Sequence, residues 1–150
     1  MKIKLEVSRE RDEEIRAFLT AHGIEVDDDA PLVLHETDRY PDRLSVRRRD
    51  TGEKVLIAAA DVVFAEAFGH EVVVHTTGGA FVTAEPLGRL LAGLDPTLFC
   101  RVSNSVFVAR LHVRKIKPTL SQKFVLELSD GAIVDVTRGY YASFREYFRL

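Results

Sequence analysis

A chain of 150 residues with 46% hydrophobic and 29% charged side chains has the composition of an ordinary soluble globular protein. Its single cysteine, Cys100, excludes an intrachain disulfide framework, and no apolar run approaches the ~18 residues of a membrane span. The N-terminus lacks the apolar core of a signal peptide, so we expect a cytoplasmic protein.

The net charge of −2 conceals an asymmetry along the chain. Residues 1–42 hold 6 basic and 12 acidic side chains, which gives −6, whereas residues 43–150 hold 15 and 11, which gives +4. Opposite signs in the two parts suggest different partners, although a solvated surface without a partner would also carry such charges.

The first part of the chain is predicted to alternate strands with one helix. Apolar residues alternate over residues 3–7, which predicts a strand, and Ile15, Phe18 and Leu19 then fall at helical spacing. Ser8 is of a type that caps helices, and Gly23 is well placed to end this one.

Short strands are expected over residues 24–26 and 32–35. Asp27-Asp28-Asp29 between them indicates a solvated loop, because no further spaced ligands or turn glycine complete a calcium site. Residues 37–43, which contain Pro41, are typical of a linker.

From residue 44 onward the pattern predicts mostly strands. Turn-forming pairs punctuate it at Thr51-Gly52, Gly78-Gly79 and Asp130-Gly131, where the backbone can take φ > 0. The expected strands are residues 44–49, 54–58, 62–67, 71–75, 80–83, 99–102, 105–109, 113–117, 124–128 and 132–136. A short helix begins at Pro86 with a leucine-rich buried side, and an aromatic amphipathic helix ends the chain.

Motifs of enzymes and metal sites are missing from the sequence. His70 and His75 lie near one strand at a spacing of five, so the period of two points them to opposite faces. There is no zinc pattern, no phosphate-binding glycine loop and no Gly-x-Ser-x-Gly elbow. We therefore expect no enzyme, no metal and no cofactor.

Residues 99–118 carry five basic side chains and no acid. Such a cluster favours phosphate binding, and Asn104 can read a base edge through two hydrogen bonds. Ser103-Asn104-Ser105 would equally serve as a plain turn or bulge. The basic residues are Arg101, Arg110, Arg114, Lys115 and Lys117.

The start of the last helix carries one cation in an unfavourable place. If Thr137 caps this helix, Arg138 falls in its first turn, where it opposes the helix dipole at a cost of ~0.3–1 kcal/mol. An external phosphate or base, or a local salt bridge, would explain such a residue.

The C-terminal part resembles the LytTR family of bacterial DNA-binding domains over about residues 44–150. The resemblance rests on Phe99-x-Arg101-Val102-Ser103-Asn104-Ser105 followed by Val108, on Gly131 with Val136-Thr137-Arg138, and on the aromatic final helix. The segment from Asp61-Val62 to Glu66 is similar to a family strand.

The resemblance implies a fold that is α+β and mainly β, with long loops that project into DNA. It places DNA contacts on His70, on Ser103 and Asn104, and on Arg138. Together with the basic stretch, the predicted DNA-binding residues are His70, Arg101, Ser103, Asn104, Arg114, Lys115, Lys117 and Arg138. Ala109 departs from the usual Asn and Thr137 from the usual Ser, and the first change calls the geometry or affinity of this region into question.

We therefore interpret residues 44–150 as a LytTR-like β-rich domain of a transcriptional regulator that binds specific double-stranded DNA as a homodimer. The alternative is an interaction or ligand-sensing module that has kept the fold without tight DNA binding. Residues 1–43 form a short αβ extension, too short for a receiver domain, which is a candidate for dimerisation or regulation. Genes of similar stand-alone LytTR proteins often neighbour one for a small membrane protein that restrains the regulator, so such a protein is a further expected partner.

Overall fold

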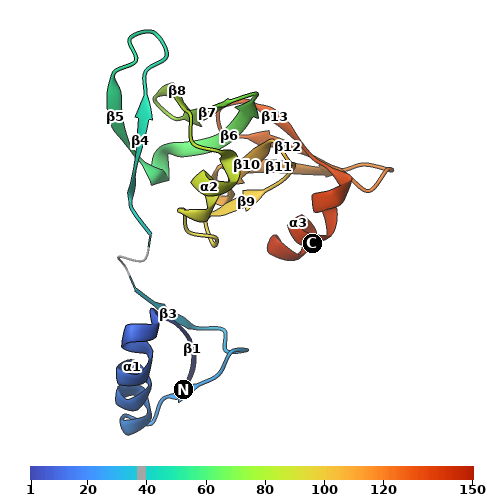
Figure 1. The fold of residues 1–150 in the computed structure, drawn as a ribbon. Helices are drawn as coiled ribbons and strands as arrows, with labels where there is room; N and C mark the ends of the chain where they lie inside the picture. The colour runs from blue at the N-terminus through green and yellow to red at the C-terminus, as the bar shows by residue number, and fades with distance from the viewer. Residues whose placement is uncertain (37–39) are drawn as a thin grey trace. The chain divides into compact units, whose positions relative to one another are not determined.

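The computed structural model describes residues 1–36 and 40–150, and it divides into two compact units, Met1–Tyr40 and Pro41–Leu150 (Figure 1). The division falls three residues before the expected boundary between residues 43 and 44. Of the predicted linker over residues 37–43, the first three residues lie outside the described residues.

The N-terminal unit is a three-stranded parallel sheet with one helix. Its elements are β1 (Lys2–Glu6), α1 (Arg9–Ala21), β2 (Glu25–Val26) and β3 (Val33–His35), and the strand order is β2-β1-β3. The predicted strand–helix–strand order is thus confirmed. Among the described residues of this unit, Ile3 and Leu19 are the buried apolar side chains, whereas Phe18 is 60% exposed.

Helix α1 begins and ends where the sequence predicted, but only its C-terminal end is formed by the predicted residue type. Ser8 precedes the helix, but its side chain forms no capping bond, and its amide instead donates to Glu36 Oε1 at 2.7 Å. Gly23 takes a φ of 76°, which residues with a Cβ rarely adopt, and it reverses the chain after the helix.

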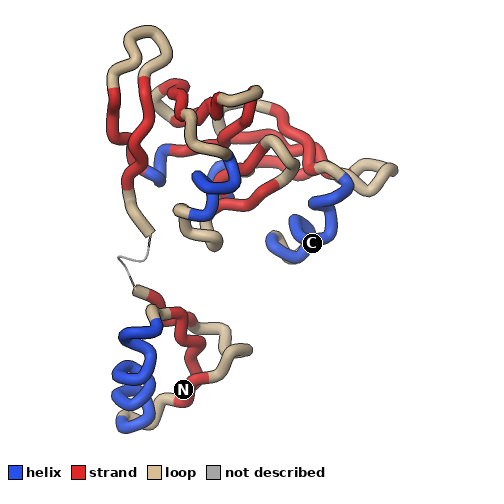
Figure 2. The backbone as a smooth tube through the Cα atoms, viewed as in Figure 1, coloured by secondary structure: helices blue, strands red, loops and turns tan. Residues whose placement is uncertain are grey.

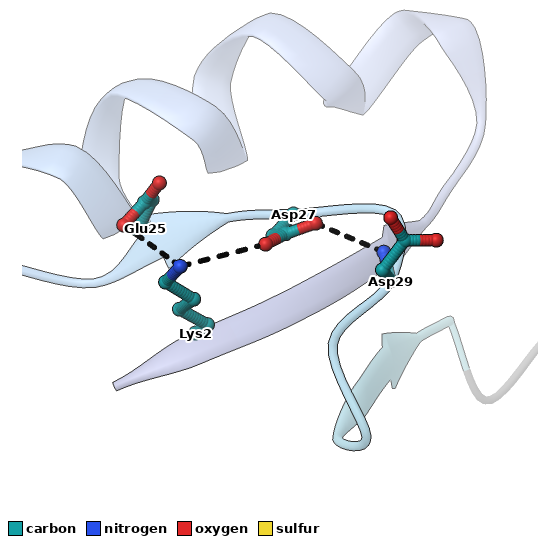
Figure 3. Close-up of polar contacts among 4 residues, drawn as sticks. All are labelled: Lys2, Glu25, Asp27 and Asp29. Carbon is teal, nitrogen blue, oxygen red and sulfur yellow. Dashed lines mark hydrogen bonds and ion pairs between the residues drawn. The ribbon is translucent and has the colours of Figure 1, made fainter.

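The acidic loop after β2 is held by a lysine rather than arranged as a cation site (Figure 3). Lys2 Nζ lies 4.0 Å from Glu25 Oε2 and 3.7 Å from Asp27 Oδ2, and Asp27 Oδ1 accepts the amide of Asp29 at 3.0 Å. No group of three metal-binding side chains occurs within residues 1–36 and 40–150.

The C-terminal unit contains a seven-stranded sheet, a three-stranded sheet and two short α-helices (Figures 1 and 2). The larger sheet has the order β5-β4-β8-β7-β6-β10-β9, and the smaller β11-β12-β13. The strands of the larger sheet are β4 (Arg43–Arg47), β5 (Lys54–Ala58), β6 (Val62–Phe68), β7 (Glu71–Thr76), β8 (Gly79–Thr83), β9 (Phe99–Arg101) and β10 (Val106–Ala109). The remaining elements are η1 (Ala59–Asp61), α2 (Leu87–Ala92), η2 (Arg110–His112), β11 (Val113–Pro118), β12 (Phe124–Leu128), β13 (Ile133–Val136), η3 (Arg138–Tyr140) and α3 (Tyr141–Tyr147).

The larger sheet is covered on both faces. One core cluster packs leucines of α2 against it, and the other packs it against the smaller sheet and α3, where Phe144 is completely buried. Side chains of β10 alternate between the two clusters: Val106 and Val108 enter one, Phe107 and Ala109 the other. A strand buried on both faces explains why residues 106–109 read as an uninterrupted apolar run.

The predicted hairpins are present, with one displaced turn. Gly52 and Gly131 adopt φ of 70° and 86° in the expected turns. Between β7 and β8 the turn is formed by residues 77–78, and Gly79 begins β8 instead of turning the chain. Thr76 explains the shift, because its hydroxyl accepts the Gly78 amide at 3.1 Å and donates to the Gly79 carbonyl at 2.7 Å.

Candidate nucleic-acid interface

Pairing between β6 and β10 brings two distant loops to one end of the larger sheet. Glu66 pairs with Val106, and the Ala67 amide donates to the Ser105 carbonyl at 2.8 Å. The turn after β6 consists of Gly69, whose φ is 59°, and the exposed His70. His70 therefore lies at the same end of the sheet as the loop of residues 102–105.

The segment after β13 joins the same end. The Thr137 amide donates to the Val102 carbonyl at 3.0 Å, and the Tyr140 hydroxyl donates to Asn104 Oδ1 at 3.0 Å. Residues 69–70, 102–105 and 137–140 thus form one surface, which we call the loop cluster.

Thr137 stands at the N-cap position of η3, the 3-10 turn that leads into α3, but its side chain forms no capping bond. The predicted cap was therefore wrong in mechanism. The Thr137 hydroxyl donates instead to the Val102 carbonyl at 3.5 Å, and the same carbonyl also accepts the Thr137 amide. Arg138 begins η3 as an exposed side chain, and no salt bridge to it occurs within the described residues.

Arg101 holds the loop of residues 102–105 from within. Its Nε donates to the Ser103 carbonyl at 3.1 Å and its Nη2 to the Asn104 carbonyl at 2.6 Å. Ser103 is buried, and its hydroxyl accepts the Ser105 amide at 3.3 Å. Both side chains are engaged with the loop itself, so in this structure they position Asn104.

Among the exposed side chains of the loop cluster, those of His70, Asn104 and Arg138 have hydrogen-bonding groups that no other described residue satisfies. Asn104 Oδ1 is fixed by Tyr140, whereas its Nδ2 donates no hydrogen bond to any residue that the structure describes. An amide, an imidazole and a guanidinium on one loop cluster can together donate to and accept from a base edge.

The predicted basic residues do not all gather at the loop cluster. Pro118 pairs with Phe124, and Phe124 with Val136, the residue before Thr137. The loop cluster therefore lies at the Pro118 end of β11. Lys117 is one residue from Pro118, whereas Arg114 stands near the opposite end of the strand, about 13 Å from Pro118. Arg110 lies at that far end too, since its amide donates to the Leu98 carbonyl at 2.8 Å.

A bulge between Val113 and Lys115 sets which side of β11 is charged. Val113 and Ile116 both pack on the core, so Lys115 and Lys117 project from the outer side. Lys115 Nζ lies 3.8 Å from Glu127 Oε2, which partly neutralises it, whereas Lys117 forms no salt bridge among the described residues.

Three groups outside the loop cluster, His75, Cys100 and Tyr147, have pKa values shifted by burial. Burial lowers the pKa of His75, whose ring stacks on Phe64 at 4.1 Å, so the ring favours its neutral form. Burial raises the pKa of the Cys100 thiol to about 11 and that of Tyr147 to about 12, and the Tyr147 hydroxyl donates to the Thr97 carbonyl at 2.8 Å.

No helix within the described residues is both long and apolar enough to cross a membrane.

Comparison with known protein families identifies the domain that carries the loop cluster. Residues 52–149 match the model of the LytTr DNA-binding domain. The chain belongs to the LytTR family. The residue range agrees with the resemblance seen over residues 44–150, and the α+β, mainly β fold is confirmed.

Two curated regulators and one solved structure are similar to this LytTR chain. The transcriptional regulatory protein LytR of Staphylococcus aureus (strain N315) is 28% identical over 72 residues, covering 48% of this chain and 29% of LytR. The CO-responsive transcriptional regulator RcoM of Rhodospirillum rubrum is 33% identical over 116 residues, covering 77% of this chain and 42% of RcoM. A LytTr DNA-binding domain from Bacillus cereus superposes with a TM-score of 0.68 at 20% identity, covering 73% of this chain and 99% of that one. The chain therefore spans less than half of the two curated regulators.

Sequence reasoning did not anticipate the role of Tyr140. A tyrosine that is partly buried needs a partner for its hydroxyl, and this was the signal that could have pointed to Asn104. Ala109, the departure from the family pattern, is buried in the core at the end of β10 remote from residues 102–105. Ala109 therefore packs in the core cluster that includes the leucines of α2, at the opposite end of β10 from the loop cluster.

Proposed function

We propose that this LytTR protein is a transcriptional regulator that binds specific sequences in double-stranded DNA through the loop cluster. The observation that carries the proposal is the fixed Asn104 amide, held by Tyr140 through its side chain and by Arg101 through its main chain. A preorganised amide loses little conformational freedom on binding, and an asparagine can bond an adenine at both N6 and N7 in the major groove.

The neighbouring side chains complete a surface of suitable chemistry. Arg138 can bond guanine or a phosphate, and His70 adds a further donor or acceptor. Lys117 supplies a phosphate contact near the same end, and Lys115 a weaker one because Glu127 competes for it. We assign Arg101 and Ser103 to positioning the loop, and Arg114 to a DNA contact only where the duplex extends along β11.

We further assign the N-terminal unit to homodimerisation. It has 40 residues and two buried apolar side chains within its described part, which is too small a core for independent stability. β3 is an edge strand of its sheet, and Leu32, Val33 and Leu34 are each 40% exposed or more. Exposed apolar edges favour strand pairing. A second copy of the chain, related by a twofold axis, would cover the edge of β3 and its apolar side chains in both protomers. A membrane protein that restrains the regulator is the competing occupant.

The test is to select bound sequences from a random duplex library with the full chain, and to map binding sites across the genome. Enrichment of one repeated sequence by the unaltered chain, lost with Asn104→Ala, supports the proposal. Recovery without any shared sequence, or no recovery at all, would favour an interaction or ligand-sensing module that has kept the LytTR fold.

A further inference from the structure

The hairpin of β4 and β5 carries most of the positive charge of the C-terminal unit. Residues 43–58 contain five basic and two acidic side chains, a net of +3, whereas all of residues 43–150 amount to +4. Figure 1 shows this hairpin at the edge of the larger sheet next to β8, to which it is joined through one residue pair, Arg47 and Val82. The hairpin is thus a basic edge of the same sheet that carries the loop cluster, and the proposed function assigns it no role.

Two cations of this hairpin face each other without a counter-charge. Arg47 pairs directly with Lys54 across the strands, and both are exposed. Like charges directly opposite in a sheet are destabilising. Arg48 and Arg49 have acidic partners, Glu53 at 3.7 Å and Glu71 at 2.6 Å, but neither Arg47 nor Lys54 forms an ion pair with a described residue. Binding of an external anion would relieve the repulsion between Arg47 and Lys54.

A hollow beside these two cations offers room and further donors. It has a volume of about 200 Å³, and its polar lining residues are Ser45, Arg47, Lys54, Thr83 and Glu85. The Thr83 hydroxyl accepts the Glu85 amide at 3.1 Å, which leaves its own proton free to donate. Glu85 lies beyond salt-bridge distance of both cations and so offsets them only in part. Two cations and two hydroxyls are suitable ligands for one phosphate group.

The hollow lies at the same end of the sheet as His70. Thr83 pairs with Val72, two residues after His70, and the Arg49–Glu71 ion pair links the hairpin to the start of β7. Three strand spacings separate β8 from β10, about 14 Å across the sheet. The major groove of DNA is about 12 Å wide. A loop at residues 102–105 that enters the groove would therefore bring the hollow to the flanking backbone.

We infer that the hollow formed by Ser45, Arg47, Lys54 and Thr83 binds a backbone phosphate of DNA at the edge of the groove that the loop cluster reads. The inference rests on the proposed function and deepens it. It assigns a phosphate subsite to a hairpin whose first strand lies outside the residues that match the family model.

Fluorescence anisotropy with a labelled duplex of mixed sequence tests the subsite, because a phosphate contact is independent of sequence. Removal of one contact should reduce the log–log slope of affinity against salt by about 0.9, which corresponds to about an eightfold loss near 0.1 M salt. Arg47→Ala and Lys54→Gln should each show this loss, whereas Glu85→Gln should bind more tightly. Arg11→Ala, which removes an exposed cation from the N-terminal unit, is the matched control and should keep the slope.

Thermal melting checks the fold of each variant. Arg47→Ala should melt no lower than the unaltered chain, because it removes a like-charge pair. Equal slopes for the unaltered chain, Arg47→Ala and Lys54→Gln would overturn the subsite while leaving the proposed function in place. Absence of any duplex binding by the unaltered chain would overturn both.

Discussion

Asn104→Ala separates a base-reading side chain from one that only shapes a turn. Arg101 bonds the main-chain carbonyls of residues 103 and 104, and alanine keeps both carbonyls, so the loop should retain its path. The substitution removes the hydrogen bond from Tyr140, which is exposed and contributes no more than about 1.5 kcal/mol to the free energy of unfolding. For a chain of this length 1 kcal/mol shifts Tm by roughly 2–4 °C, so we expect a small fall in Tm.

The expected effect on DNA is larger and restricted to the cognate site. Loss of one base contact costs about 1–3 kcal/mol, equivalent to about a 5- to 150-fold loss of affinity. Binding to duplex of unrelated sequence should stay nearly constant, because phosphate contacts carry that term. Competition anisotropy with both duplexes measures the ratio.

Two further variants sharpen the assignment to Asn104. Asn104→Asp keeps an acceptor for Tyr140 and the size of the side chain, but it removes the amide donor and adds a negative charge, so cognate affinity should fall more than with alanine. Tyr140→Phe removes the hydrogen bond and keeps the amide, so the loss should be smaller. If Asn104→Ala lowers Tm by many degrees and reduces binding to both duplexes alike, the residue is a turn former and the reasoning is refuted.

Three more expectations follow from the charge, the division into units and the burial of the cysteine. With about four phosphate contacts, affinity for duplex DNA should fall with salt at a log–log slope near −3 to −4, and a flat dependence would contradict phosphate binding. Deletion of residues 1–40 should leave residues 41–150 folded, since both core clusters lie there, and light scattering should report a change from dimer to monomer. A full chain that is monomeric at high concentration would rule out dimerisation through β3. Because burial raises the pKa of Cys100 to about 11, the thiol is protonated at pH 8 and should react with iodoacetamide slowly in the native protein and quickly in urea; fast native labelling would contradict its burial.

The sequence by itself determined the local elements and the family. Short apolar runs rich in β-branched residues, bounded by turn residues, predicted β6, β7, β12 and β13, and the glycines at positions 52 and 131 predicted turns, because these signals depend on neighbouring residues and on backbone sterics alone. Family motifs around Asn104 and Arg138 pointed to the loop cluster for the same reason: they are short and continuous in the chain.

Only the tertiary structure decided what the polar side chains do. Arg101 was expected at phosphates, yet it bonds two loop carbonyls, and the Thr137 hydroxyl bonds Val102 rather than its own helix. Which lysines and arginines lie near the loop cluster depends on the register of β11 against β12 and on the bulge between Val113 and Lys115. These contacts join residues through strand pairing and side-chain geometry, and no periodicity or spacing in the sequence encodes the direction in which a long side chain finally points.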